Sequence, residues 1–295
     1  MTASPLLSAA LDATARGHYV FPLIPGTKRP AVKDWEGRAT LDPDRVRRCW
    51  STGPYNVGIA CGPSGLLVVD LDMPKSPDDL PPEHWARDGI TSGHDVFAAV
   101  CEQYGQSYPD QTFTAVSPSG STHLYFAAPP GANLRNTSGD KGRGLGWKID
   151  TRAGGGLVVA VGSTTPKGAY TAVQDVPVAS LPVWLLPLLL PAPLPPQRPV
   201  TVPLTGVDRR TAYLKAAVDR QLATITDASD HHNDAIYRSA VALGQFVAGG
   251  ELTEADVTGW LMDAAARVHH APARAARTIT SGLRAGAHRP RTVAA

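Results

Sequence analysis

The sequence contains little cysteine. Its 295 residues include only Cys49, Cys61 and Cys101, which are widely spaced and form no CxxC motif or Cys/His cluster. A disulfide framework and a structural zinc site both need closely grouped or evenly paired ligands, so we predict neither.

Long apolar runs are also missing. The best candidate, residues 183–190, is short and is interrupted by Pro187, whereas a membrane-spanning helix needs about 20 apolar residues. The first residues lack the basic start and apolar run of a secretory signal. We therefore expect a cytoplasmic protein with no membrane partner.

Acidic residues are absent from the end of the chain. None follows Asp263, although the chain as a whole carries a net charge of only +2. A polyanion partner would explain this imbalance, and so would a solvated, arginine-rich helix end. The basic residues of this segment are Arg267, Arg274, Arg277, Arg284, Arg289 and Arg291.

The remaining pattern predicts an α+β fold. We expect helices over residues 4–16, 42–50 and 95–104, and strands over residues 19–23, 57–60, 66–71, 112–116, 122–126, 146–150 and 157–161. Few of the strands are separated by a helix, so the sheet should be mostly antiparallel and backed by helices. Gly62-Pro63-Ser64-Gly65 has the composition of a hairpin turn between two of these strands.

Composition changes near residue 183, where prolines begin to recur every few residues. We predict a catalytic domain over residues 1–185, an extended, semi-rigid linker over 186–205 and a small all-α bundle over 206–295. In the bundle, Asn233 and Thr253 are expected to cap helices, and Pro272 to open the last one.

The apolar run 66–71 leads into the first candidate site, Asp70-Leu71-Asp72. Side chains two apart in a strand point to the same side, so both carboxylates should face one way. Such a pair is costly unless a cation lies between them, and Mg²⁺ or Mn²⁺ suits oxygen ligands. A solvated strand end is the alternative explanation.

A polar segment, residues 117–122, gives the second signal. Ser121 and His123 stand at the start of an apolar strand, where hydroxyls, loop amides and an imidazole could hold phosphate oxygens. A structural histidine is the plain alternative.

Asp150 and Arg152, followed by three glycines at 154–156, give the third signal. The acid could complete a three-carboxylate site, and the guanidinium could clamp a triphosphate. A glycine-rich turn with a surface salt bridge is the alternative.

These three motifs, in this order, resemble those of the archaeo-eukaryotic primase superfamily. The closest resemblance is to its bifunctional primase-polymerase group. Residues 17–30 with Trp35, residues 56–60, and residues 157–160 leading to Ser163 and Tyr170 extend the similarity over about residues 6–185. Segments of 206–295 are similar to the helical primase region that follows such domains.

The resemblance implies a template-dependent DNA primase and polymerase that uses NTPs or dNTPs on single-stranded DNA. Two Mg²⁺ or Mn²⁺ ions would be held by Asp70, Asp72 and Asp150. The incoming triphosphate would be contacted by Ser121 and His123, with Arg152, Lys28 and Ser163 assisting. The bundle would grip the initiating nucleotide or the template.

Two features differ from many members of the group. The zinc-binding stem lacks its cysteines, and the helicase loop GxxxxGK[ST] is absent, so a separate helicase partner is one explanation. Two other functions stay open. One is a metal-dependent phosphohydrolase or nucleotide-sugar transferase that uses the DxD pair. The other is a replication-initiator-like protein that binds nucleic acid without catalysis.

Overall fold

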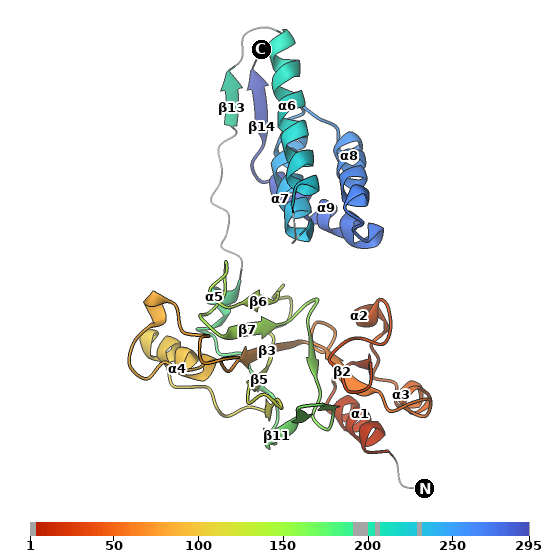
Figure 1. Ribbon diagram of the computed structural model, residues 1–295, viewed down its shortest axis with the longest axis vertical. Coiled ribbons are helices and arrows are strands. Elements are labelled where there is room, and N and C mark those ends of the chain that lie inside the picture. The colour runs from red at the N-terminus through yellow and green to blue at the C-terminus, as the bar shows by residue number, and fades with distance from the viewer. Residues whose placement is uncertain (1–3, 191–199, 204–206, 229–231, 295) are drawn as a thin grey trace. The chain divides into compact units, whose positions relative to one another are not determined.

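The computed structural model describes residues 4–190, 200–203, 207–228 and 232–294. It divides into two compact units, Met1–Ala192 and Pro193–Ala295 (Figure 1). Among the described residues, no helix is both long enough and apolar enough to cross a lipid bilayer.

Helices of the first unit begin where the sequence supplies caps. Asp42 accepts hydrogen bonds from the amides of Asp44 and Arg45, and Ser92 accepts one from Asp95, so both helices start at a satisfied N-cap. The predicted helices over 4–16, 42–50 and 95–104 are confirmed within a few residues. The helices are α1 (Pro5–Ala15), α2 (Trp35–Arg38), α3 (Pro43–Trp50), α4 (Gly93–Gln103) and α5 (Leu186–Leu189), with a 3₁₀ turn at Glu83–Trp85.

The main sheet has seven strands, ordered β11-β4-β5-β3-β7-β6, with β12 also paired to β5. Apart from β12 with β5, all its pairs are antiparallel, as expected. Its strands are β3 (Leu66–Leu71), β4 (Thr114–Val116), β5 (Thr122–Ala127), β6 (Thr137–Ser138), β7 (Ile149–Arg152), β11 (Thr171–Gln174) and β12 (Ala179–Ser180).

A second, three-stranded sheet contains β1 (Val20–Leu23), β2 (Asn56–Ala60) and β8 (Leu157–Val159). The expected hairpin between residues 57–60 and 66–71 is wrong. The chain does turn at Gly65, but β2 pairs with β1 and β8 whereas β3 pairs with β5 and β7. The turn therefore carries the chain from one sheet to the other. A small ribbon, β9 (Thr164–Thr165) with β10 (Gly168–Ala169), follows β8.

The alternation of side chains along β3 separates two apolar clusters. Leu67, Val69 and Leu71 pack in the cluster that includes helix α4. Val68 points the other way, into the cluster that includes α1, α3 and the three-stranded sheet. Asp70 shares the face of Val68, so the sequence period of two places a carboxylate at the end of a buried apolar face.

The predicted linker begins later than expected. Leu185 and Leu189 are buried in the first unit's core, so residues 186–189 form helix α5 rather than an extended segment. The free energy gained by burying these leucines outweighs the tendency of the prolines to keep the segment extended. Residues 191–199 and 204–206 of the predicted linker lie outside the described residues.

The second unit contains four helices among its described residues. They are α6 (Val207–Thr226), α7 (His232–Ala248), α8 (Glu254–Arg267) and α9 (Pro272–Gly286). Two glycines let α9 approach α7: a Cβ at Gly286 would lie 2.3 Å from the carbonyl oxygen of Val241, and one at Gly282 would lie 2.5 Å from Ala240 Cβ.

Two details of this unit were not foreseen. A parallel pair, β13 (Val200–Pro203) with β14 (Arg291–Ala294), accompanies the helices. Asn233 lies inside α7 instead of capping it, and its Oδ1 accepts a hydrogen bond from Thr278 (2.8 Å) and contacts His270 (3.2 Å). Thr253 does cap α8, by accepting from the Asp256 amide.

Candidate active site

The candidate site is built across three neighbouring strands of the main sheet. Asp70 of β3 lies opposite His123 of β5 on one side and opposite Asp150 of β7 on the other. Residues opposite each other in antiparallel strands project from the same face. The fold thus brings together three polar residues that the sequence places up to 80 positions apart.

Asp70 is largely buried, with its side chain 15% exposed. Its Oδ1 lies 3.2 Å from His123 Nε2 and has no hydrogen bond of good geometry. Burial alone would raise the pKa of Asp70; the nearby His123, Arg152 and Lys28 outweigh it and hold the pKa below its usual value. The residue is therefore a carboxylate at neutral pH with an unused oxygen.

Asp72 follows the end of β3 and is held at both its backbone and its side chain. Its amide donates to the carbonyl of Lys148 (2.8 Å), and its Oδ1 accepts from Ser121 Oγ (2.8 Å). Burial, then the charges of Asp70 and Asp150, raise its pKa, and the Ser121 hydrogen bond opposes this rise. The three carboxylates are close enough to repel one another.

Asp150 is occupied by protein donors. Its Oδ2 accepts from Arg152 (2.8 Å) and its Oδ1 accepts from the amide of Gly139 (3.1 Å). Arg152 shares the face of Asp150 on β7, because the two residues are two apart in one strand.

A pocket of about 350 Å³ opens beside these strands. Four residues predicted from the sequence line it: Asp70, His123, Arg152 and Lys28. Lys28 comes from the loop after β1, and its ammonium lies 5.7 Å from the ring centroid of Tyr170. Two cations, Lys28 from a loop and Arg152 from β7, therefore line one pocket together with Asp70.

Ser121 and Ser163 have other partners. Ser121 acts on the site through Asp72 rather than as part of the pocket wall. Ser163 is fully buried and its Oγ accepts a hydrogen bond from the amide of Val57 (2.9 Å). The Ser163 hydroxyl thereby links β2 to the segment after β8, and Ser163 does not line the pocket.

Trp35, Asn136 and Tyr170 are among the further residues that line the pocket. Trp35 stacks on Phe21 (ring centroids 4.7 Å apart), and Asn136 Oδ1 accepts from the amide of Ala153 (2.8 Å). The motif pattern included Trp35 and Tyr170 but assigned them no role. Asn136 lies in a polar loop with no motif, so nothing in the sequence distinguished it.

The donor chemistry of the site fits a hard divalent cation. Carboxylate oxygens are the ligands that Mg²⁺ and Mn²⁺ prefer, and Asp70 keeps a buried oxygen without a donor. However, within the described residues no three His, Cys, Asp or Glu side chains already converge as a metal site. The Asp150 carboxylate accepts from Arg152 and from the Gly139 amide, so a metal would have to replace at least one of these donors.

Comparison with known families agrees with this geometry. The family model described as "Bifunctional DNA primase/polymerase, N-terminal" matches residues 10–184, which include every candidate site residue named above. No curated protein matches the chain. The matched segment covers more than half of the sequence, and on this basis the chain belongs to the bifunctional DNA primase/polymerase (Prim-Pol) family.

Proposed function

We propose that this protein is a template-dependent DNA primase and polymerase, which synthesises primers on single-stranded DNA by nucleotidyl transfer from NTPs or dNTPs. The observation that carries the proposal is the alignment of Asp70 with His123 and Asp150 across β5, β3 and β7, beside a pocket with two cations. Family membership supports the same reaction class.

The reaction joins the 3′ oxygen of the growing chain to the α-phosphorus of the incoming nucleotide. The bond between that phosphorus and the bridging oxygen breaks, pyrophosphate leaves, and the hydroxyl proton passes to solvent. Such a reaction depends chiefly on positioning and on neutralising the charge of the triphosphate.

The charges of the site support a metal-assisted reaction. Asp70, Asp72 and Asp150 contribute three negative charges, and Lys28 and Arg152 contribute two positive ones, so an unassisted triphosphate would be repelled. Asp70, Asp72 and Asp150 would hold two Mg²⁺ or Mn²⁺ ions, which neutralise the phosphates and acidify the attacking hydroxyl.

The other residues would hold the nucleotide. Lys28 and Arg152 bind phosphate oxygens, and the His123 imidazole, which lines the same pocket, is a further donor. Ser121 keeps Asp72 oriented. Trp35 supplies an apolar wall of the pocket for the sugar or base.

The second unit would bind the template. Its exposed arginines include Arg274, Arg277 and Arg284 on α9, and no acid follows Asp263. Positions 274, 277, 281 and 284 share one side of a helix, so these cations form a row that suits a phosphate backbone. A separate helicase is a further partner in this proposal.

Primer synthesis on single-stranded DNA with labelled nucleotides and Mn²⁺ or Mg²⁺ tests the proposal. Asp70→Asn removes one carboxylate charge with little change in shape, and Glu102→Gln, at an exposed position on α4, is the matched control. We expect products from wild type and from Glu102→Gln, and a loss of about 10³-fold or more in Asp70→Asn. DNA binding without any nucleotide incorporation would favour a non-catalytic, initiator-like protein instead.

A further inference from the structure

The segment that carries Lys28 and Trp35 also carries a surplus of positive charge. Residues 24–51 contain seven Lys or Arg residues and four Asp or Glu residues, so their surplus exceeds the net charge of +2 of the whole chain. A local excess of this kind is what a negatively charged partner neutralises. The seven cations, all at exposed positions, are Lys28, Arg29, Lys33, Arg38, Arg45, Arg47 and Arg48.

Helix α3 divides its charge between a neutral pair and two free cations. Arg47 forms an ion pair with Asp44 (2.8 Å). Arg45 and Arg48 are three residues apart, so they lie on one side of the helix. Both are exposed, and among the described residues neither has an ion pair. Their two guanidinium groups are therefore available to an anion from outside.

Arg38 adds a third cation to this side of α3. Its backbone carbonyl, at the end of α2, accepts a hydrogen bond from the Arg45 guanidinium (3.4 Å), so the two helices meet here. Burial raises the pKa of Cys49 on α3, and the charge of Arg38 opposes this rise. Arg38 is exposed and has no ion pair within the described part of the chain. We call Arg38, Arg45 and Arg48 the α2–α3 arginines.

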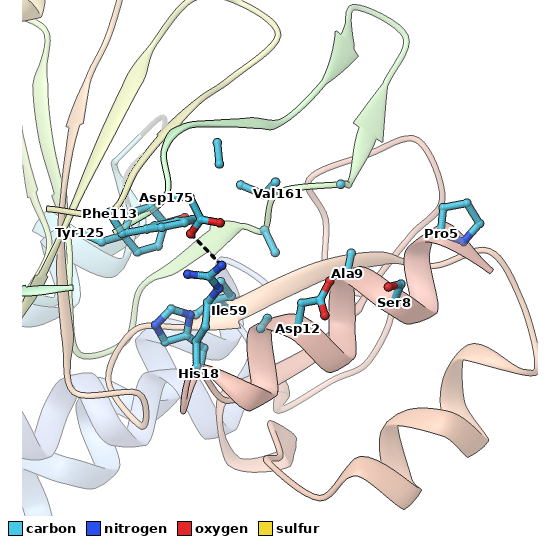
Figure 2. Close-up of a pocket in the computed structure, with 15 residues that line it drawn as sticks. Pro5, Ser8, Ala9, Asp12, His18, Ile59, Phe113, Tyr125, Val161 and Asp175 are labelled. Atoms are coloured by element: carbon cyan, nitrogen blue, oxygen red, sulfur yellow. Dashed lines mark ion pairs between the residues drawn. The ribbon is translucent and has the colours of Figure 1, made fainter. Parts of the chain in front are cut away.

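Arg16, elsewhere in the first unit, is engaged differently. Figure 2 shows its ion pair with Asp175 (2.8 Å) at a pocket along α1. Its guanidinium also lies over the ring of Phe113, 4.9 Å from the centroid. Burial and then the charge of Arg16 lower the pKa of His18 to about 4. The charge of Arg16 is thus directed into the fold, whereas the α2–α3 arginines face solvent.

Helix α2 links these arginines to the candidate active site. Trp35, its first residue, lines the pocket beside Asp70, and Arg38 is its last residue. Glu36 Oε1 accepts a hydrogen bond from the amide of Gly155 (2.8 Å), another residue of the pocket wall, and so holds α2 there. A helix of four residues is about 6 Å long, so the arginines begin close to the pocket. Figure 1 shows α2 and α3 at the same edge of the first unit.

We propose that α2 and α3 form a binding surface for single-stranded DNA, on which Arg38, Arg45 and Arg48 contact the phosphates of the strand that passes the pocket. Exposed guanidinium groups on two helices suit an extended polyanion, and none of the three lines the pocket that a triphosphate would enter. Phosphate contacts fix the position of a strand but read no sequence, so the surface accepts any template. The identification of the polyanion as DNA rests on the proposed function, but binding can be measured without synthesis.

The test measures single-strand binding by the full-length protein in EDTA. Fluorescence anisotropy with a labelled oligonucleotide at several salt concentrations gives the dissociation constant and its salt dependence. Arg45→Gln/Arg48→Gln removes two charges and keeps long, polar side chains. Asp44→Asn/Arg47→Gln, which removes the neutral ion pair from the same helix, is the matched control. Arg45→Lys/Arg48→Lys keeps the charge.

We expect Arg45→Gln/Arg48→Gln to weaken binding about tenfold or more at about 50 mM salt. The slope of log K against log salt concentration should become shallower by about 1.4, because each lost phosphate contact contributes about 0.7. The lysine variant and the matched control should keep the wild-type slope. An unchanged slope in the glutamine variant, or an equal loss of binding in the matched control, would overturn the proposal. The expected changes in a protein that synthesises no primers would support this surface and overturn the proposed function alone.

Discussion

Asp70 and Asp150 lie directly opposite each other in the β3–β7 ladder, two acids facing across adjacent strands. Like charges in this position destabilise a sheet. Residues 66–69 of β3 are all apolar, so the acid at position 70 is not a consequence of the strand pattern. A cation bound between the carboxylates, as proposed above, would relieve this repulsion, and without the cation the repulsion leads to the first prediction.

Asp72→Asn should make the metal-free protein more stable while abolishing synthesis. Burial and the charges of Asp70 and Asp150 raise the pKa of Asp72, so its charged form is disfavoured in the folded state. At pH 7 we expect a gain of about 0.5–1 kcal/mol in the free energy of unfolding. Urea denaturation in EDTA measures the gain; it should vanish below pH 4, where Asp72 is protonated in both states. A less stable variant at pH 7 would contradict the repulsion argument.

Ser121→Ala should shift the pH dependence of activity. The Ser121 hydroxyl donates to Asp72 and lowers the pKa of that carboxyl. Its loss should therefore move the acid limb of the rate profile to higher pH, with a smaller change at the plateau. Ser119→Ala, at an exposed position in the same loop, is the control. An unshifted acid limb with a uniformly lower rate would indicate a packing role only.

Arg152→Lys should raise the KM for the nucleotide by about ten- to a hundredfold, although it keeps the charge. The Arg152 guanidinium donates a hydrogen bond to Asp150 and also lines the pocket. A lysine ammonium cannot reproduce the planar, two-pronged donor geometry of a guanidinium. Primer extension at varied nucleotide concentration measures the effect. If Arg152 served only to hold Asp150 in place, kcat would fall and KM would stay unchanged.

His18 should make the protein less stable in mild acid. Its pKa is about 4 in the folded protein and about 6.5 when unfolded, so between these values the unfolded state binds more protons. Stability is thus retained above pH 6.5 and falls as the pH drops toward 4, by up to about 3 kcal/mol. Thermal unfolding from pH 7 to 4 should show a shallower decline for His18→Leu than for wild type. Parallel declines would mean that His18 is hydrated and titrates normally.

Much of the fold could be predicted because local signals were strong. A continuous apolar run located β3, and Asp42 and Thr253 marked helix starts that the structure confirms. The pairing partners could not be predicted in the same way. The Gly62–Gly65 turn fixes a change of direction, but which strands then pair depends on contacts remote in sequence.

In the candidate site, too, relations within one strand could be predicted and relations between strands could not. Asp70 and Asp72 could be grouped from their spacing within one strand, whereas the approach of His123 and Asp150 requires the sheet order. Ser163 looked similar to Ser121 in sequence because both are hydroxyls at strand ends. Only the fold reveals that Ser121 donates a hydrogen bond to Asp72, whereas Ser163 accepts one from the Val57 amide. Asn136 could not be found at all, because loop residues carry no periodicity.

Single-strand binding should depend on salt through the exposed arginines of α9. Each phosphate contact releases counterions, and for a single strand it contributes about −0.7 to the slope of log K against log salt concentration. Arg277→Ala and Arg284→Ala, both at exposed positions, should each make the slope shallower by about that amount and weaken binding to all sequences alike. Arg238→Ala, exposed on α7 beside Asp234, should leave the slope unchanged.

The slopes come from fluorescence anisotropy with a labelled oligonucleotide at several salt concentrations. Equal slopes for Arg238→Ala and the two α9 variants would mean that binding of single-stranded DNA depends on the overall charge of the second unit rather than on the row of arginines on α9. An effect confined to one template sequence would point to contacts with bases in place of phosphates.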